Sequence, residues 1–282
     1  MFSLRLMCPS ELSEYVSADL WEEGTCGIRE SEGEQGTELI AGFALEAEAA
    51  QARARELMAR FAKWNPQWEE EPETDWVEMT KESWPPREVG ETWFVAAPWN
   101  VEPTPAGRTR LVQNPGLACG TGDHPCTQLA LAAVAATVRP GDTVADIGSG
   151  SAILAVASLL AGARLVAAVD PDEAVVSAAR ENLALNLRRD EQARCLVVTG
   201  SADCLRSETF DVTVANISST IVLMLAKELQ RITKPGGWLI LTGFSSDESC
   251  AFNGLMERPQ EATLGGWCCL FGKTPGNASG AG

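Results

Sequence analysis

Residues 144–154 read V-A-D-I-G-S-G-S-A-I-L. A short β-branched run gives way there to two closely spaced glycines, and a helical pattern follows. Gly148 and Gly150 let the backbone turn tightly and approach a ligand, because a Cβ atom would restrict φ and fill the space. The stretch therefore predicts a strand, a glycine turn and a helix that together form a nucleotide-type pocket.

Asp146 discriminates between the cofactors that such a pocket holds. Its carboxylate attracts the sulfonium and ammonium groups of S-adenosylmethionine, whereas it repels the pyrophosphate of NAD. The third glycine of a dinucleotide-binding motif would fall at Ile153, which is bulky and β-branched. These residues favour S-adenosylmethionine, and an oxidoreductase would require that NAD bind instead.

Strands and helices alternate through the second half of the chain, as a parallel sheet requires. The strands are predicted at 143–147, 165–170, 194–199, 210–215 and 238–242, and the helices at 125–137, 151–161, 173–187 and 219–233. Ligands bind such sheets at the carboxyl ends of the strands. The polar residues predicted at those ends are Asp146, Asp170, Asp203 and Asn216.

The first 80 residues predict a separate, smaller α+β domain of the ferredoxin-like kind. Its strands are expected near 2–7, 25–29, 37–45 and 75–80, and its helices at 10–23 and 46–63. We expect residues 81–113 to form a linker and β-rich connection, 114–273 the cofactor-binding domain and 274–282 a disordered tail. Seven of the nine tryptophans precede residue 100, where packing is their expected role.

The acidity of the chain is concentrated near its start. Residues 1–95 hold 21 acidic and 8 basic residues, against 18 and 14 in the remainder. Such a surface repels nucleic acid and anionic membranes and favours a basic protein partner, although a purely solubilising surface is the alternative. With no signal peptide and no apolar run of transmembrane length, the sequence predicts a cytoplasmic protein.

The nine cysteines form no C-x-x-C pair, so they indicate neither a disulfide framework nor a zinc site. Cys119, His124 and Cys126 lie close together but lack a fourth ligand, and no metal is predicted.

Two aspartates have both a ligand role and a structural alternative. Asp170 lies 20 residues after Gly150, where a carboxylate can accept both hydrogens of a ribose diol, or it caps the helix that follows. Asp203 can accept from an adenine amino group, or it is an ordinary loop carboxylate. The glycine-dense loop at 114–125 could close over a ligand through Thr121, His124 and Thr127, or it is a turn before a helix.

Four stretches together carry a specific resemblance. They are P-G-L-A-C-G-T-G-D-H-P-C-T at 115–127, D-I-G-S-G-S-A-I-L-A at 146–155, D-P-D at 170–172 and V-A-N-I at 214–217. In this order they resemble the PrmA family, the class I methyltransferases that modify ribosomal protein eleven of the large subunit. Asn216 is present without the Pro-Pro-aromatic clamp that glutamine and adenine methyltransferases carry, which favours an amine acceptor.

The resemblance implies a Rossmann-like class I sheet and methyl transfer from S-adenosylmethionine to lysine or N-terminal amines of a basic ribosomal protein. It also implies an N-terminal domain that recognises the substrate. We expect the protein to be a monomer. The implied catalytic residues are Asn216, Thr127 and His124. The implied cofactor-binding residues are Cys119, Thr121, Thr127, Asp146, Gly148, Gly150, Asp170, Asp203 and Asn216.

Two alternatives to this function stay open. One is a protein-lysine methyltransferase with a different acceptor. The other is an inactive, cofactor-binding ribosome-assembly factor, because Cys119 and Ala152 stand where the family usually has an aromatic residue and a glycine.

Overall fold

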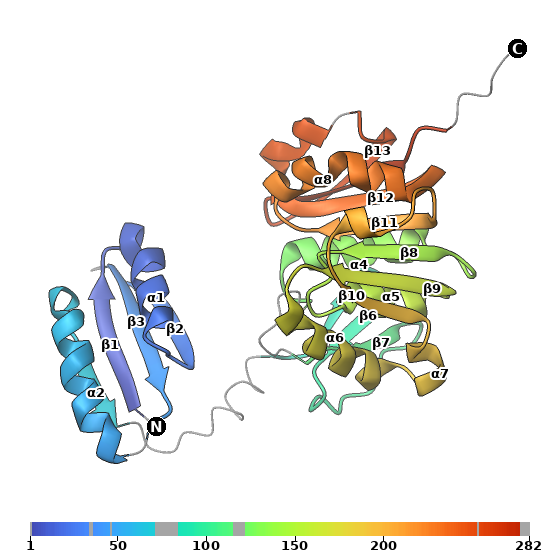
Figure 1. Cartoon of the computed structure of the whole chain (residues 1–282). Helices are drawn as coiled ribbons and strands as arrows, with labels where there is room; N and C mark the ends of the chain where they lie inside the picture. The colour runs from blue at the N-terminus through green and yellow to red at the C-terminus, as the bar shows by residue number, and fades with distance from the viewer. Residues whose placement is uncertain are drawn as a thin grey trace, which may run out of the picture. The chain divides into compact units, whose positions relative to one another are not determined.

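The computed structural model describes residues 2–33, 36–45, 47–70, 84–114, 122–252 and 254–276. The chain divides into two compact units, Met1–Thr80 and Lys81–Gly282 (Figure 1). Each unit has its own buried core.

The first unit is a four-stranded antiparallel sheet with two helices. Its elements are β1 (Phe2–Cys8), η1 (Ser10–Leu12), α1 (Ser13–Glu22), β2 (Gly27–Gly33), β3 (Gly36–Phe43), α2 (Ala47–Arg60), η2 (Ala62–Trp64) and β4 (Gln67–Glu70). The strand order is β2-β3-β1-β4. Leu20 of α1 and Leu57 of α2 pack in one core with Leu4 and Leu39 of the sheet.

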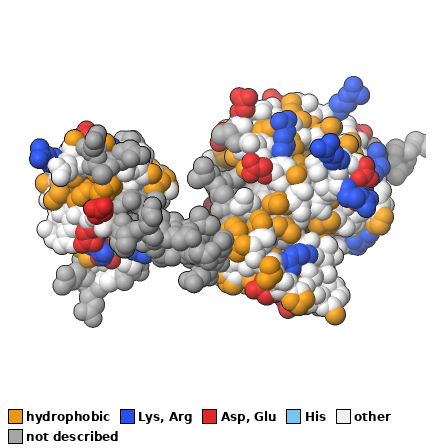
Figure 2. Space-filling view, turned by 90° about the horizontal axis from the view of Figure 1, so that it is seen from below, with side chains coloured by type: hydrophobic (Ala, Val, Ile, Leu, Met, Phe, Trp, Pro, Cys, Tyr) orange, Lys and Arg blue, Asp and Glu red, His pale blue; other side chains and the backbone are white. Residues whose placement is uncertain are grey.

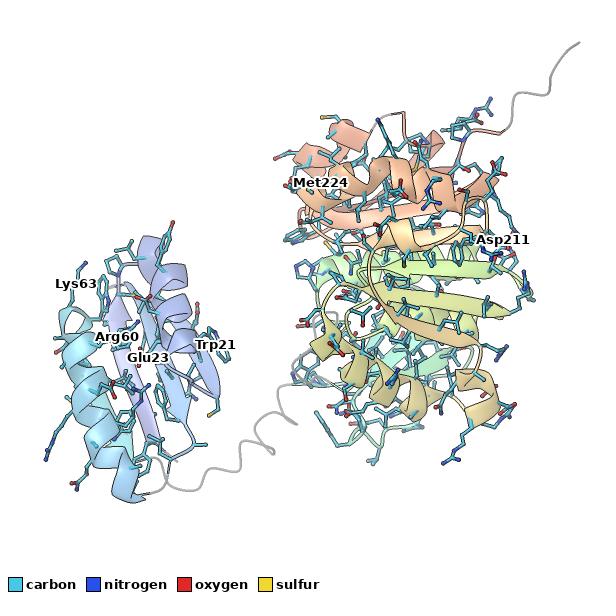
Figure 3. The ribbon with its side chains drawn as sticks, in the orientation of Figure 1. Trp21, Glu23, Arg60, Lys63, Asp211 and Met224 are labelled. Carbon is cyan, nitrogen blue, oxygen red and sulfur yellow. The ribbon has the colours of Figure 1, made fainter. Side chains whose placement is uncertain are left out.

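The predicted fourth strand at 75–80 lies outside the described residues. The edge strand that pairs with the free side of β1 is β4, which was not predicted from the sequence. Only Trp68 among its four residues packs against the core, with its ring stacked on Phe2 at 5.8 Å. Beside the core, Glu23 accepts hydrogen bonds from Arg53 and pairs with Arg60, which joins the end of α1 to α2 (Figure 3).

The second unit has a seven-stranded sheet and a smaller three-stranded sheet. Its strands are β5 (Arg87–Val89), β6 (Trp93–Ala96), β7 (Thr109–Val112), β8 (Thr143–Ile147), β9 (Leu165–Asp170), β10 (Cys195–Thr199), β11 (Phe210–Asn216), β12 (Thr233–Ser245), β13 (Glu257–Leu264) and β14 (Trp267–Lys273). Its helices are α4 (Pro125–Thr137), α5 (Ile153–Leu160), α6 (Glu173–Asn186), α7 (Arg189–Gln192) and α8 (Ser219–Ile232), with η3 (Ala202–Cys204) and η4 (Ser246–Phe252).

The large sheet has the order β10-β9-β8-β11-β12-β14-β13. The first five strands are parallel, and β14 and β13 are antiparallel additions. Both faces are buried, because alternate residues of each strand belong to different cores. Val144 packs with α4, α5 and α6, whereas Ala145 packs with α8 and η4. This two-sided burial explains the near-continuous apolar runs of the parallel strands.

The predicted α/β architecture with a smaller α+β unit is confirmed. The strands predicted at 143–147 and 165–170 and the helix at 125–137 have the predicted bounds. Residues 84–113, expected as a connection, fold with the second unit, where Trp93 and Leu111 lie in its core. The segment after Asp247, for which the sequence predicts no fold, forms the β13–β14 hairpin that completes the sheet.

The surface carries both signs of charge. On the face of the second unit in Figure 2, the described acidic, basic and hydrophobic side chains are interspersed rather than grouped by kind. In the described part of the chain, no helix combines the length and apolar character needed to span a membrane.

Candidate active site

The carboxyl ends of β8, β9 and β11 meet at one edge of the large sheet. The register pairs the last residue of β8 with the penultimate residues of β9 and of β11. Gly148, Asp170 and Asn216 therefore lie side by side. The strand order reverses here. The sheet extends through β9 and β10 on one side of β8, and through β11 and β12 on the other side. Open α/β sheets bind ligands at such a switch point.

The glycine turn after β8 depends on its glycines for two reasons. Gly148 and Gly150 have φ values of +72° and +47°, which are strained for residues with a Cβ atom. A Cβ atom at Gly148 would also lie 2.3 Å from Cγ2 of Ile217. The space beside Gly148 is thus occupied by a side chain from the end of β11, whereas the sequence analysis assigned that space to a ligand.

Asp170 binds the glycine turn directly. Its Oδ2 accepts from the backbone N–H of Gly150 at 2.9 Å, and its Oδ1 accepts from that of Asp172 at 3.0 Å. A carboxylate has about four acceptor positions, so two remain. The predicted turn-capping and diol-binding roles are therefore compatible, and the bond to Gly150 attaches the carboxylate to the predicted cofactor turn.

Asp146 is 1% exposed. Its Oδ2 accepts from the N–H of Ala155 in α5 at 3.0 Å, whereas its Oδ1 has no hydrogen-bond partner among the described residues. Burial raises the pKa of Asp146 to about 7, the Ala155 hydrogen bond lowers it, and the charge of Asp170 raises it. An unpartnered buried oxygen costs free energy, so this side chain suits a bound donor or cation.

Asn216 is held by Thr127, which lies 89 residues earlier in the chain. The Asn216 side-chain Nδ2 donates to Thr127 Oγ1 at 3.1 Å. Thr127 is 2% exposed in the first turn of α4, so it orients the amide and is itself shielded from solvent. This bond leaves the amide oxygen Oδ1 of Asn216 without a hydrogen bond to any described residue, and a carbonyl acceptor thus remains at the sheet edge.

His124 caps α4. Its Nδ1 accepts from the backbone N–H of Cys126 at 3.2 Å, and its ring meets Trp267 edge-on with centroids 4.6 Å apart. From the sequence, His124 was expected in the pocket, and neither its capping role nor its contact with Trp267 was predicted. Gly265 and Gly266, which precede Trp267, are a hairpin signal that indicates where β14 begins.

Of the remaining predicted residues, the structure describes only Asp203. Asp203 is exposed in η3, after β10, and Ala202 beside it is buried. Cys119 and Thr121 lie outside the described residues. Among the residues that the structure describes, no cluster of three histidine, cysteine or carboxylate side chains is arranged to hold a metal.

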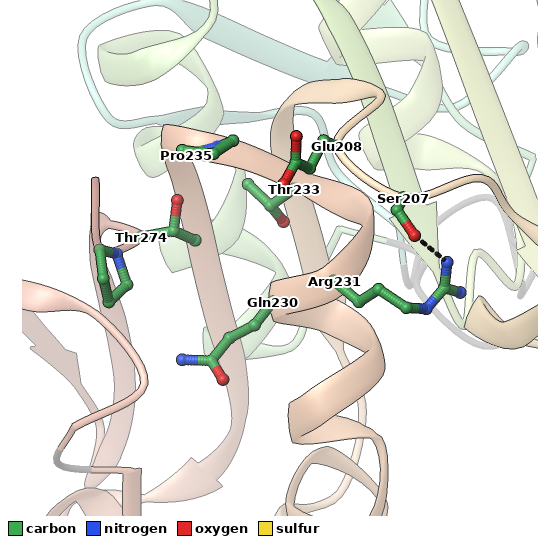
Figure 4. Close-up of a pocket in the computed structure, with 8 residues that line it drawn as sticks. Ser207, Glu208, Gln230, Arg231, Thr233, Pro235 and Thr274 are labelled. Carbon is green, nitrogen blue, oxygen red and sulfur yellow. Dashed lines mark hydrogen bonds between the residues drawn. The ribbon is translucent and has the colours of Figure 1, made fainter. Parts of the chain in front are cut away.

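A cavity of about 400 Å³ lies at the opposite edge of the sheet (Figure 4). Its lining includes Glu208, before β11, and Thr233, the first residue of β12. The guanidinium of Arg231 donates to Ser207 Oγ at 3.0 Å and pairs with Glu228 at 2.6 Å. Because its cation is already neutralised and the predicted site residues lie elsewhere, this cavity is not the candidate active site.

Comparison with known proteins decides the family. Residues 9–275 match the family model described as ribosomal protein L11 methyltransferase (PrmA). The chain belongs to this family. This membership confirms the predicted class I, S-adenosylmethionine-dependent protein methyltransferase.

Several known proteins of the PrmA family are similar to this chain. The ribosomal protein L11 methyltransferase of Synechococcus elongatus is 35% identical over 213 residues, covering 72% of this chain and 70% of the relative. That of Burkholderia pseudomallei is 35% identical over 238 residues, covering 83% and 73%. The crystal structure of ribosomal protein L11 methylase from Lactobacillus delbrueckii subsp. bulgaricus has a TM-score of 0.59 and 27% identity, covering 68% of this chain and 99% of that chain.

The described residues of this PrmA-family chain fit S-adenosylmethionine. The unpartnered oxygen of Asp146 would accept from or neutralise a cationic group, and Asp170 would accept the ribose hydroxyls with its two remaining acceptor positions. The turn at Gly150 brings backbone to the same edge. We keep these assignments, with Asp203 for the adenine, as proposals for the cofactor-binding residues.

Cofactor binding is expected to weaken as the pH falls below 7. A bound cation favours the ionised form of Asp146, so binding releases the proton that the free protein holds near its pKa of about 7. Asp146 is ionised in most molecules at pH 8 but only in a small fraction of them at pH 6. The Kd for the cofactor therefore rises by about tenfold over this range. Calorimetry in buffers of different ionisation enthalpy measures both the Kd and the released proton.

Asp146→Asn is the control for this pH dependence. Its amide cannot titrate, so its weaker affinity is expected to be nearly independent of pH. The same proton release in this variant would assign the effect to another group.

Proposed function

We propose that this PrmA-family chain transfers methyl groups from S-adenosylmethionine to lysine or N-terminal amines of ribosomal protein L11. The observation that carries the proposal is the Asn216 amide, held by Thr127 with its carbonyl oxygen available beside the glycine turn. An amine needs such an acceptor to orient it, and the names of the curated relatives supply the acceptor protein.

The acceptor amine must be neutral when it attacks. A lysine amine has an unperturbed pKa of about 10.4, and desolvation next to a cation lowers that pKa. When bound, S-adenosylmethionine supplies an electrophilic methyl group on its sulfonium. The neutral nitrogen would form the new N–C bond as the C–S bond breaks, with the bonding pair left on the departing sulfur. The methylated ammonium product would then lose its extra proton to solvent.

Asn216 would orient the amine by accepting one of its N–H groups through Oδ1. Thr127 keeps the amide in this orientation, because its hydroxyl accepts from the opposite end of the amide. Positioning of this kind is a large catalytic term in group transfer. His124 contributes by capping α4, the helix that carries Thr127. Because Nδ1 of His124 makes the cap, Nε2 is the ring nitrogen that could contact a ligand in the pocket.

The N-terminal unit is proposed to bind the acceptor protein. Residues 1–95 have an excess of 13 acidic over basic residues, which favours a basic partner and disfavours nucleic acid. In α1, Tyr15 is 72% exposed and Trp21 is 52% exposed. Figure 3 labels Trp21 on this helix. Exposed aromatic side chains are typical anchors in protein interfaces. We place this reaction in the cytoplasm, carried out by a monomer.

A methylation assay tests the proposed function. Purified protein is incubated with S-adenosylmethionine and recombinant L11, and mass spectrometry counts and locates the added methyl groups. The expected result is methylation at lysine or the N-terminus, lost when these amines are chemically acetylated beforehand. Transfer to other proteins of a lysate but not to L11 would favour the alternative acceptor.

An inactive assembly factor is the second alternative. It predicts that S-adenosylmethionine binds without any methyl transfer. Ala152 raised this alternative, and its φ of +61° shows that the alanine is strained. Its side chain is nevertheless fully buried in the core of the second unit, beside Ile153 and Leu154.

A further inference from the structure

Two asparagines on α6 bind the backbone of the segment that leads out of β7. The side-chain amide of Asn186 accepts from the N–H of Val112 at 2.7 Å and donates to its carbonyl at 2.6 Å. This is the pairing that a neighbouring strand would make. Since β7 is an edge strand of its three-stranded sheet, Asn186 satisfies backbone groups that would otherwise lack a partner.

Asn182, one helical turn earlier, reaches the glycine turn as well. It is 2% exposed. Its Oδ1 accepts from the N–H of Asn114, just after β7, and its Nδ2 donates to the carbonyl of Ser151, both at 3.0 Å. One buried amide thus joins the exit of β7 to the turn that follows β8.

The bond to Ser151 falls at the most strained part of that turn. The residues on either side, Gly150 and Ala152, both have positive φ values, +47° and +61°. Ala152 carries a Cβ atom, which makes this conformation unfavourable. A strained backbone of this kind persists only where its surroundings hold it. Asn182 supplies such a restraint from a separate helix.

We infer that Asn182 is a positioning residue for the binding of S-adenosylmethionine. By fixing the Ser151 carbonyl, Asn182 holds the glycine turn in the conformation that binds the cofactor. The inference rests on the proposed function, because it requires the cofactor to bind at this turn. Asn182 acts through the turn, and Asn186 provides a matched control: it has the same side chain, lies on the same helix face four residues later and binds β7 without touching the turn.

Asn182→Leu and Asn186→Leu are compared by calorimetry with S-adenosylmethionine and by steady-state methylation kinetics on the full chain. Asn182→Leu is expected to raise the Kd and the KM for the cofactor by about tenfold, with kcat at saturation nearly unchanged. Asn186→Leu is expected to leave the Kd within about twofold of wild type while lowering the melting temperature.

Asn182→Asp covers the case in which the leucine variant fails to fold. At pH 8 the carboxylate keeps the acceptor for the Asn114 N–H and loses the donor to Ser151, so a similar loss of affinity is expected. Wild-type affinity in a folded Asn182→Asp variant, or an equal loss in both leucine variants, would overturn the inference. Absence of binding to wild type would instead overturn the proposed function.

Discussion

Asn216→Ala is expected to lower kcat for methylation by about 100-fold while the chain still binds S-adenosylmethionine. The variant removes the acceptor that orients the amine but leaves Asp146, Asp170 and the glycine turn intact. Single-turnover methylation of L11 measures the loss in the chemical step, and calorimetry measures the retained affinity. Unchanged turnover would remove Asn216 from the mechanism.

Thr127→Val is the matched control for that experiment. The valine side chain has nearly the same volume as the buried threonine that it replaces, but it lacks the hydroxyl that fixes the Asn216 amide. We expect a smaller fall in kcat, of about tenfold, because the amide remains but loses its preferred orientation. If Thr127→Val had no effect while Asn216→Ala lost activity, the hydrogen bond between them would have no part in positioning.

Gly148→Ala is expected to lower the free energy of unfolding by about 3 kcal/mol. The left-handed φ of +72° costs about 1–2 kcal/mol for alanine, and relieving the contact with Cγ2 of Ile217 costs about 1–3 kcal/mol more. In a unit of this size, the melting temperature falls by about 10 °C. Calorimetric or circular dichroism melting measures this change.

Two further variants separate the causes. Gly141 has a φ of +93°, and no atom of the described residues lies within 4 Å of an added Cβ atom, so Gly141→Ala reports backbone strain alone, about 1–2 kcal/mol. Ile217→Ala removes Cγ2 and should recover part of the loss when combined with Gly148→Ala. Strictly additive effects of the two substitutions would contradict the steric explanation.

The local sequence pattern predicted two kinds of element correctly. The first kind is a strand buried on both faces, such as the apolar runs at 143–147 and 165–170. The second is a helix with a start signal, such as the proline that begins α4. The pattern missed β4 because it is an edge strand with mostly polar side chains, stabilised by the contact of Trp68 with Phe2. It did not indicate β13 for a similar reason, since most of that strand is exposed.

The sequence by itself determined the alternation of strands and helices along the chain. A parallel sheet follows from this alternation, and it gathers Asp146, Asp170 and Asn216 at one edge, because parallel strands place their carboxyl ends together. The tertiary structure alone decided what each polar group contacts. Asn216 meets Thr127 across 89 residues, and Asn182 joins two segments that precede it by 31 and 68 residues. Such contacts depend on packing between distant elements, which local periodicity does not encode. The same packing buries Asp146, and this burial raises its pKa. The sequence pointed to S-adenosylmethionine through the charge of Asp146, but only the tertiary structure decided the pKa of that carboxyl.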